Sequence, residues 1–386
     1  IIRRHNRHYW LLTVMSVMSA YYVSYAQSTF EENGILYMED LSDVSKLAVI
    51  VIPKTSPIDG NNTLYSGSIT VPAHVEHDLD IYEVVGIAQL AFKGNKLEEL
   101  TIEEGPKMVG NYAFNNTALR KLVYPGSLGR LPGLYSPSLE ELKLGEGIIE
   151  INEVLDGGKL KDMIFPKSLK IISKCQLNAI EGKLTLGPNI TEINLSFQTP
   201  QFSELTISGK SAKIWGSFDH CEALENVDLS GVKTVETSFI ECPSLIRINL
   251  GDIDRINRSF NHLQNLRQLH IPGSCIEVVG SFRDATSLEV LKIDEGVESI
   301  EDSFYGAENL KVLYIPSSLS LALSLSRNKL EEVHLTSSMP VEECPKYIQH
   351  PKTDKLKVFV PKRSAENYLK AWGNVINPEK VAFEEE

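Results

Sequence analysis

The segment Leu266–Ser287 reads LRQLHIPGSCIEVVGSFRDATS, and LEVLKIDEGVESIEDSFYGAEN follows it directly at Leu288–Asn309. Each unit has the form L-x-x-L-x-I, then a turn with Gly or Pro, then Val or Ile, and finally Ser-Phe with a short polar link. Self-similarity at a fixed period of this length is typical of a solenoid of stacked coils. These two units therefore predict how most of the chain folds.

One such unit cannot fold alone. Burying its two Leu, one Ile, one Val and one Phe contributes about 10 kcal/mol, at roughly 2 kcal/mol per side chain. Ordering each of its 21 or 22 residues costs about 1–2 kcal/mol of backbone entropy, which is more in total. Neighbouring units must therefore stack, with every strand paired to the next.

The strand positions recur along the chain every 20 to 22 residues. The strand centres are Leu100, Leu122, Leu142, Met163, Leu184, Leu205, Val227, Ile248, Leu269, Leu291, Leu313 and Val333. A second apolar residue lies two positions after each centre, so both side chains point to the inside of a short strand. We predict an α/β-type but mostly β leucine-rich-repeat solenoid, a right-handed horseshoe stack. Its parallel sheet should line the concave side, with turns or short irregular segments opposite.

An aromatic position follows the turn in most units. It holds Phe92, Phe114, Phe197, Phe218, Phe239, Phe260, Phe282 and Phe304. The units between residues 119 and 184 lack this Phe, and we expect Leu134, Leu155 and Leu177 to fill its place. The sequence thus predicts a continuous aromatic spine with one less regular patch.

Two segments carry a resemblance to a known family. VGNYAFNNTALRKLVYP at Val109–Pro125 and VETSFIECPSLIRINL at Val235–Leu250 resemble the BspA-type leucine-rich repeat, I-G-x-x-A-F-x-x-C-x-x-L-x-x-[IV]-x-[IL]-P. The resemblance covers nearly everything after residue 26. Most units have Ser-Phe where the family has Ala-Phe, an exchange of small residues that we expect to leave the coil unchanged. The family includes bacterial adhesins that bind host matrix proteins, so the resemblance implies adhesion.

Four regions are expected along the chain. Residues 1–26 have the basic, apolar and small-residue order of a cleaved signal peptide. Residues 27–95 should form an N-terminal β-rich cap, residues 96–337 the leucine-rich repeats, and residues 338–386 a C-terminal cap. After cleavage of the signal peptide, no remaining segment is apolar enough to insert in a membrane. The sequence therefore predicts an exported protein, located outside the cell, at its surface or in the periplasm.

The C-terminal cap contains KVFVPKRSAENYLKAWGNV, which is similar to the closing segment of the same family. It should form a last strand and then a helix. Ser364 is a suitable cap for a helix that runs to about Trp372. Tyr368, Leu369 and Trp372 then share one helix face by their spacing.

Catalytic, cofactor-binding and metal-binding constellations do not stand out in the sequence, and we do not expect an enzyme. A His74-x-x-His77 pair suits a solvated loop better than a zinc site, which needs three or four ligands. The net charge of −13 disfavours nucleic acid and anionic lipid as partners. Cys221 and Cys242 should lie in adjacent coils within reach of a disulfide, although packing as free, buried thiols is favoured.

The strand residues that point outward should line up as a binding surface. Most are polar, but an apolar patch with a basic rim appears near the end of the stack. It comprises His270, Val290, Lys292, Val312, Tyr314 and His334. Tyr beside aliphatic area is the composition favoured at interface hot spots.

We expect a secreted or surface-exposed protein that recognises another protein, with adhesion to a host matrix protein as the sharper hypothesis. A periplasmic or envelope scaffold and a glycan-binding accessory protein are the alternatives. The sequence names neither the partner nor the oligomeric state.

Overall fold

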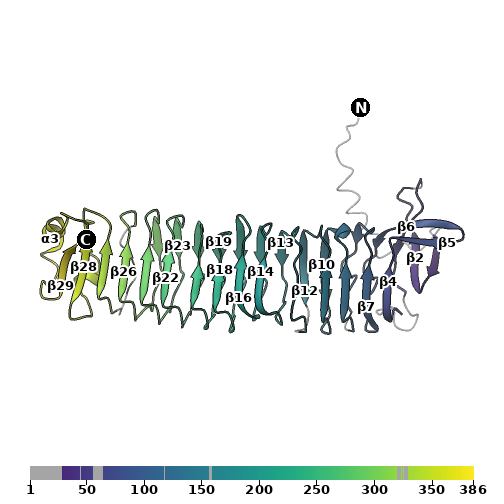
Figure 1. Ribbon diagram of the computed structural model, residues 1–386, viewed down its shortest axis with the longest axis horizontal. Helices are drawn as coiled ribbons and strands as arrows, with labels where there is room; N and C mark the ends of the chain where they lie inside the picture. The colour runs from purple at the N-terminus through teal and green to yellow at the C-terminus, as the bar shows by residue number, and fades with distance from the viewer. Residues whose placement is uncertain are drawn as a thin grey trace, which may run out of the picture.

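The computed structural model describes residues 28–43, 45–54, 64–116, 118–155, 159–319, 323, 325 and 329–386. The predicted signal peptide and the side chain of Leu155 lie outside this description. The chain forms a long row of stacked coils, nearly straight in the view of Figure 1. The prediction of a mostly β solenoid with parallel, stacked strands is confirmed.

We call the face that carries the L-x-x-L-x-I strands face A. Its strands are β4 (Gly67–Val71), β7 (Leu97–Ile102), β9 (Lys121–Tyr124), β11 (Glu141–Leu144), β14 (Glu181–Leu186), β16 (Gln201–Ile207), β18 (Asn226–Asp228), β20 (Arg247–Asn249), β22 (Gln268–Ile271), β24 (Val290–Ile293), β26 (Val312–Ile315), β27 (Glu332–Leu335), β28 (Leu356–Val360) and β29 (Val381–Glu385). They form three successive parallel sheets, β4 to β11, β14 to β20, and β22 to β29.

The first interruption of face A corrects one prediction. The strand expected around Met163 does not form, and residues 159–166 run without strand pairing. Met163 and Phe165 are only partly buried against the core, and Ile164 is 88% exposed. This unit also lacks the spine Phe, so less apolar packing holds its coil against its neighbours.

The opposite side, face B, is also a sheet. Its nine strands are β10 (Arg130–Tyr135), β12 (Glu150–Leu155), β13 (Ile171–Ser173), β15 (Glu192–Asn194), β17 (Ala212–Trp215), β19 (Val232–Glu236), β21 (Arg255–Asn257), β23 (Glu277–Val279) and β25 (Ser299–Glu301). The expectation of turns or irregular segments there is therefore wrong. Each three-residue strand contributes one buried Ile or Val that aligns with a buried residue of a neighbouring strand, as Ile256 does with Val278.

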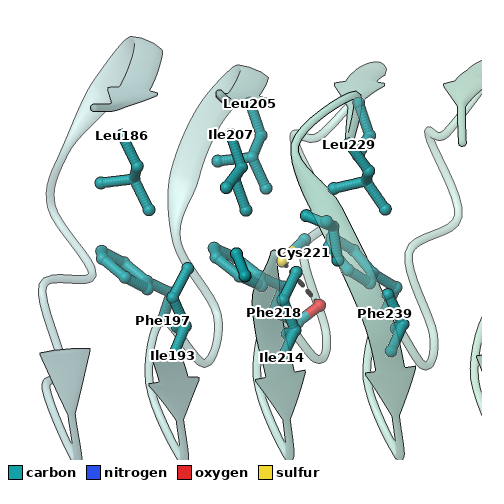
Figure 2. Packing of buried hydrophobic residues seen from close by; sticks show 14 of the residues in the cluster. Leu186, Ile193, Phe197, Leu205, Ile207, Ile214, Phe218, Cys221, Leu229 and Phe239 are labelled. Atoms are coloured by element: carbon teal, nitrogen blue, oxygen red, sulfur yellow. Dashed lines mark hydrogen bonds between the residues drawn. The ribbon is translucent and has the colours of Figure 1, made fainter. Parts of the chain in front are cut away.

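The aromatic spine lies between the two faces, as predicted. Phe197, Phe218 and Phe239 are fully buried and stack in parallel with ring centroids 5.1 and 5.0 Å apart. Figure 2 shows these rings between Leu and Ile side chains from both faces. Leu134 and Leu177 are fully buried in the units that lack the Phe.

The Ser of each Ser-Phe pair forms a buried ladder along the stack. The backbone N–H of Ser217 donates to Ser238 Oγ at 3.1 Å, and Ser238 N–H donates to Ser259 Oγ at 3.1 Å. The same contact recurs from Cys175 to Ser303.

The Ser-Phe and Ala-Phe units differ in backbone geometry, but they also differ in length, since five positions separate Val109 from Phe114 and four separate Val235 from Phe239. The expectation that Ser replaces Ala without effect therefore stays a prediction. The Phe that follows Ser has a positive φ in all six units, for example 58° at Phe239, whereas Phe92 and Phe114 after Ala do not. A positive φ is strained for an aromatic residue, so packing and the ladder must hold it.

The N-terminal part of the chain is β-rich. β1 (Thr29–Glu32), β2 (Ile35–Glu39), β3 (Ala48–Val51), β5 (His74–His77), β6 (Asp80–Ile87) and β8 (Met108–Val109) share one six-stranded sheet. β4 lies in the same part of the sequence but already pairs with β7 on face A. The first coil thus begins within the region assigned to the cap.

The C-terminal part ends in strands β28 and β29 with two helices, α2 (Lys346–Gln349) and α3 (Ala365–Trp372). The predicted helix forms, but Ser364 makes no capping hydrogen bond with its side chain. The Glu385 carboxylate instead accepts from the Ala365 N–H at 3.2 Å. Tyr368 and Trp372 are buried as expected, whereas Leu369 is 53% exposed and does not share their face.

Candidate functional site

The register of face A brings the predicted surface residues together. Val290 aligns with Val312 and Lys292 with Tyr314 across β24 and β26, and His270 aligns with Lys292 across β22 and β24. His270 and Lys292 are exposed, while Val290, Val312 and Tyr314 are half-buried. The sequence pattern therefore placed this group of neighbours correctly.

Asp294 organises the basic rim, and sequence reasoning missed it. His270 Nε2 lies 2.6 Å and Lys292 Nζ 3.1 Å from the two Asp294 carboxylate oxygens. Partial burial alone would raise the Asp294 pKa, but the hydrogen bonds from His270 and Lys292 outweigh it and lower the pKa. Asp294 follows Lys292 by two residues, on the same side of the chain, which is the only signal that could have revealed it.

His334 occupies the end of the patch but is largely covered. Its ring stacks between Tyr314 and Phe359, with centroids 4.2 and 4.5 Å away. Nδ1 lies 2.9 Å from a Glu386 carboxylate oxygen, and only 9% of His334 is exposed. His334 therefore packs against Tyr314 from the neighbouring strand more than it offers surface to a partner.

A groove runs across face A beside this patch. It has a volume of about 1140 Å³. Its lining comes from six consecutive coils, β16 to β26, and comprises Glu204, Leu205, Thr206, Asn226, Val227, Asp228, Ile246, Arg247, Ile248, Asn249, Arg267, Gln268, Leu269, His270, Val290, Lys292 and Tyr314. Four of the six predicted surface residues, His270, Val290, Lys292 and Tyr314, line it.

The groove lies over the second interruption of face A. In the fully described stretch from β20 to β22, no backbone hydrogen bond joins these two strands. On face B the same two coils stay paired through β21 and β23. The coils therefore separate on one side only, and the half-buried Ile248 is left at the floor of the groove.

Turn length explains this one-sided opening. In one coil the chain runs from Ile248 on face A to Ile256 on face B. In the next coil the corresponding segment, from Leu269 to Val278, is one residue longer. An earlier change of turn length is absorbed by a register shift on face B between Ala212 and Lys213. The pairing of β21 with β23 has no such shift, so the extra residue displaces face A instead.

The other residues considered from the sequence lie elsewhere. His74 and His77 are at the two ends of β5, where His77 stacks on Phe30 and contacts Glu32 at 2.9 Å. Within the described residues, no group of three or more His, Cys, Asp or Glu side chains is arranged to hold a metal ion.

Cys221 and Cys242 are buried free thiols in this structure. Both donate to the Phe218 carbonyl oxygen, at 3.0 and 3.3 Å. Figure 2 shows the contact made by Cys221. The two thiols thus approach one acceptor from adjacent coils, and a disulfide between them stays a prediction.

The repeats define the class of this protein as a leucine-rich-repeat solenoid. Six copies of the model for the BspA type leucine rich repeat region match residues 77–182, 158–260 and 236–341. These matches cover more than half of the chain, so it belongs to the BspA-type leucine-rich-repeat family.

The chain is similar to solved structures of three bacterial proteins. A leucine-rich repeat protein from Bacteroides ovatus is 16% identical with a TM-score of 0.41, covering 95% of this chain and 99% of its own. A leucine rich cell surface protein from Faecalibacterium prausnitzii is 12% identical with a TM-score of 0.34, covering 94% and 96%. The pneumococcal vaccine antigen PcpA is 14% identical with a TM-score of 0.29, covering 94% and 100%. No curated protein matches the chain.

Proposed function

We propose that this chain is an exported protein that binds another protein through face A, and that adhesion to a host matrix protein is its role. The observation that carries this proposal is the groove over β20 and β22, with the aligned Val290, Val312 and Tyr314 beside it. Face A there combines a recess, half-buried apolar area and a charged rim, which is the composition of protein interfaces. Membership in the BspA-type family supports the same assignment.

Binding fits this chain better than catalysis. The groove side chains include no nucleophile paired with a base, and the paired charges around Asp294 stabilise one another across neighbouring coils. Among the described residues, no helix is long and apolar enough to cross a membrane. Export through a cleaved leader would place the groove where an extracellular protein can reach it.

The test is a capture experiment with three immobilised proteins. They are residues 27–386, the same chain with Val312→Ser and Tyr314→Ala, and a face B control with Trp215→Ala, whose side chain is 48% exposed. Each is incubated with a panel of purified host matrix proteins, and Kd is measured for any protein retained. Circular dichroism checks that all three are folded.

We expect the face A variant to lose about 2 kcal/mol of binding free energy, roughly 30-fold in Kd, with the control unchanged. Equal binding by all three proteins would show that the binding site lies outside this patch. Retention of no matrix protein by the unmodified chain would contradict the proposed adhesion.

A further inference from the structure

The charges that line the groove are not equally satisfied. Asp228 accepts from Asn249 Nδ2 at 3.0 Å, and Glu204 lies 3.6 Å from Lys183. His270 and Lys292 both contact Asp294, as described above. Every acidic group and two of the four basic groups of the lining therefore already have an oppositely charged or hydrogen-bonding neighbour.

Arg247 and Arg267 are the exceptions. Neither guanidinium has a hydrogen bond or an ion pair within the described residues, and both side chains are exposed. They belong to adjacent coils, since Arg247 opens β20 and Arg267 directly precedes β22. The two unpaired positive charges thus flank the seam at which the face A strands separate.

Their position is what distinguishes them, because other exposed basic side chains that lack a partner within the described residues, such as Arg258, do not line the groove. The sequence carries 51 acidic and 38 basic residues, and exposed Lys and Arg side chains elsewhere on the stack often pair with a Glu or Asp of the next coil, as Arg120 does with Glu140 at 2.9 Å. Guanidinium groups bind carboxylates in a two-pronged geometry. A partner that supplies carboxylates here would satisfy two charges that the protein leaves open.

The floor between the arginines is apolar. Ile248 is half-buried and Ile246 is 45% exposed, and both line the groove. The facing backbone groups of β20 and β22 are not bonded to each other. Unpaired strand groups are the ones that an added extended segment bonds to. In an extended segment of a partner, alternate side chains point to opposite sides. Its acidic residues and its aliphatic residues can therefore contact different residues of the groove.

From these observations we infer that the groove takes an extended acidic segment of the partner protein, with its carboxylates on Arg247 and Arg267 and an aliphatic side chain over Ile248. The inference rests on the proposed function, because it names the chemistry of the segment that face A would bind. The groove's length across six coils suits an extended segment better than a compact ligand.

The test uses a fluorescent twelve-residue peptide of alternating Glu and Val, with Gln-Val and Lys-Val peptides of the same length as controls. Fluorescence anisotropy measures binding to the unmodified chain, to the Arg247→Gln/Arg267→Gln variant, and to a face B control, Arg255→Gln. We expect the Glu-Val peptide to bind best, and its Kd to rise about tenfold or more in the double variant only. Added salt should weaken this binding, since both charges are exposed.

Equal binding of the Glu-Val and Gln-Val peptides, or equal binding by the double variant, would overturn the inference. Binding of the captured partner to the unmodified chain, the arginine variant and the Val312/Tyr314 variant is then measured. This measurement separates failure of the inference from failure of the proposed function. If the Val312/Tyr314 variant loses partner binding and the arginine variant does not, face A remains the proposed binding site. The inference of an acidic segment is then rejected. Partner binding unchanged in both variants would reject both proposals.

Discussion

The Ser ladder gives a sharp prediction, because one hydroxyl can be removed with little other change. Ser238→Ala takes the acceptor from the Ser217 N–H, which donates to Ser238 Oγ at 3.1 Å in a fully buried position. The hydroxyl also donates to the Glu236 carbonyl at 2.8 Å, but that carbonyl keeps a second donor, the Gly216 N–H at 3.0 Å. The substitution therefore leaves one orphaned group, the N–H of Ser217.

A buried donor without a partner costs about 1–3 kcal/mol, so we expect the free energy of unfolding to fall by that amount. Urea unfolding followed by circular dichroism measures the change as a lower midpoint. The matched control is Ser230→Ala in the same coil, where Ser230 is exposed and its hydroxyl has no partner among the described residues. That substitution should change stability by less than about 0.5 kcal/mol.

An unchanged midpoint in Ser238→Ala would refute the ladder as a stabilising feature. It would mean that the Ser217 N–H finds another acceptor once the Ser238 hydroxyl is removed. A drop equal to that of the control would carry the same meaning.

Three further outcomes are expected. Deleting residues 356–386 should cause aggregation, because it exposes the β27 edge and the fully buried Val333; a soluble truncation with an unchanged melting temperature in light scattering would contradict this. Burial raises the pKa of the Cys221 thiol, so it stays protonated at pH 8 and iodoacetamide should modify it only after denaturation. A thiol that resists alkylation even in guanidinium would instead reveal the disulfide with Cys242. Mass spectrometry of the exported protein should find cleavage after Ala26, with Gln27 as the first residue, and a mature chain that retains the leader would contradict the signal peptide.

The repeat pattern predicted face A and the spine because each position carries a strong, recurring signal. Leu269, Leu291 and Phe282 recur at fixed spacing, and each is at most 3% exposed. Face B was missed because most of its strands are short. A segment such as Arg255–Asn257 contributes a single inward Ile, which gives no alternation to detect.

The groove could not be predicted for a different reason. It depends on which face absorbs a change of one residue in turn length. Face B absorbs the loss of one residue at Ala212, whereas face A absorbs the gain of one residue beside Ile248. The covering of His334 likewise depends on Glu386, 52 residues away in the sequence. Such effects are decided by packing between distant segments and leave no local pattern.

Hydrogen–deuterium exchange of the free and partner-saturated protein tests the use of face A most directly. In the free protein, amides along the seam between β20 and β22 should exchange faster than those of the paired β21 and β23. Saturation with the captured partner should slow exchange in β20, β22, β24 and β26 and leave β21, β23 and β25 unchanged. Protection confined to the face B strands would contradict the proposed binding surface.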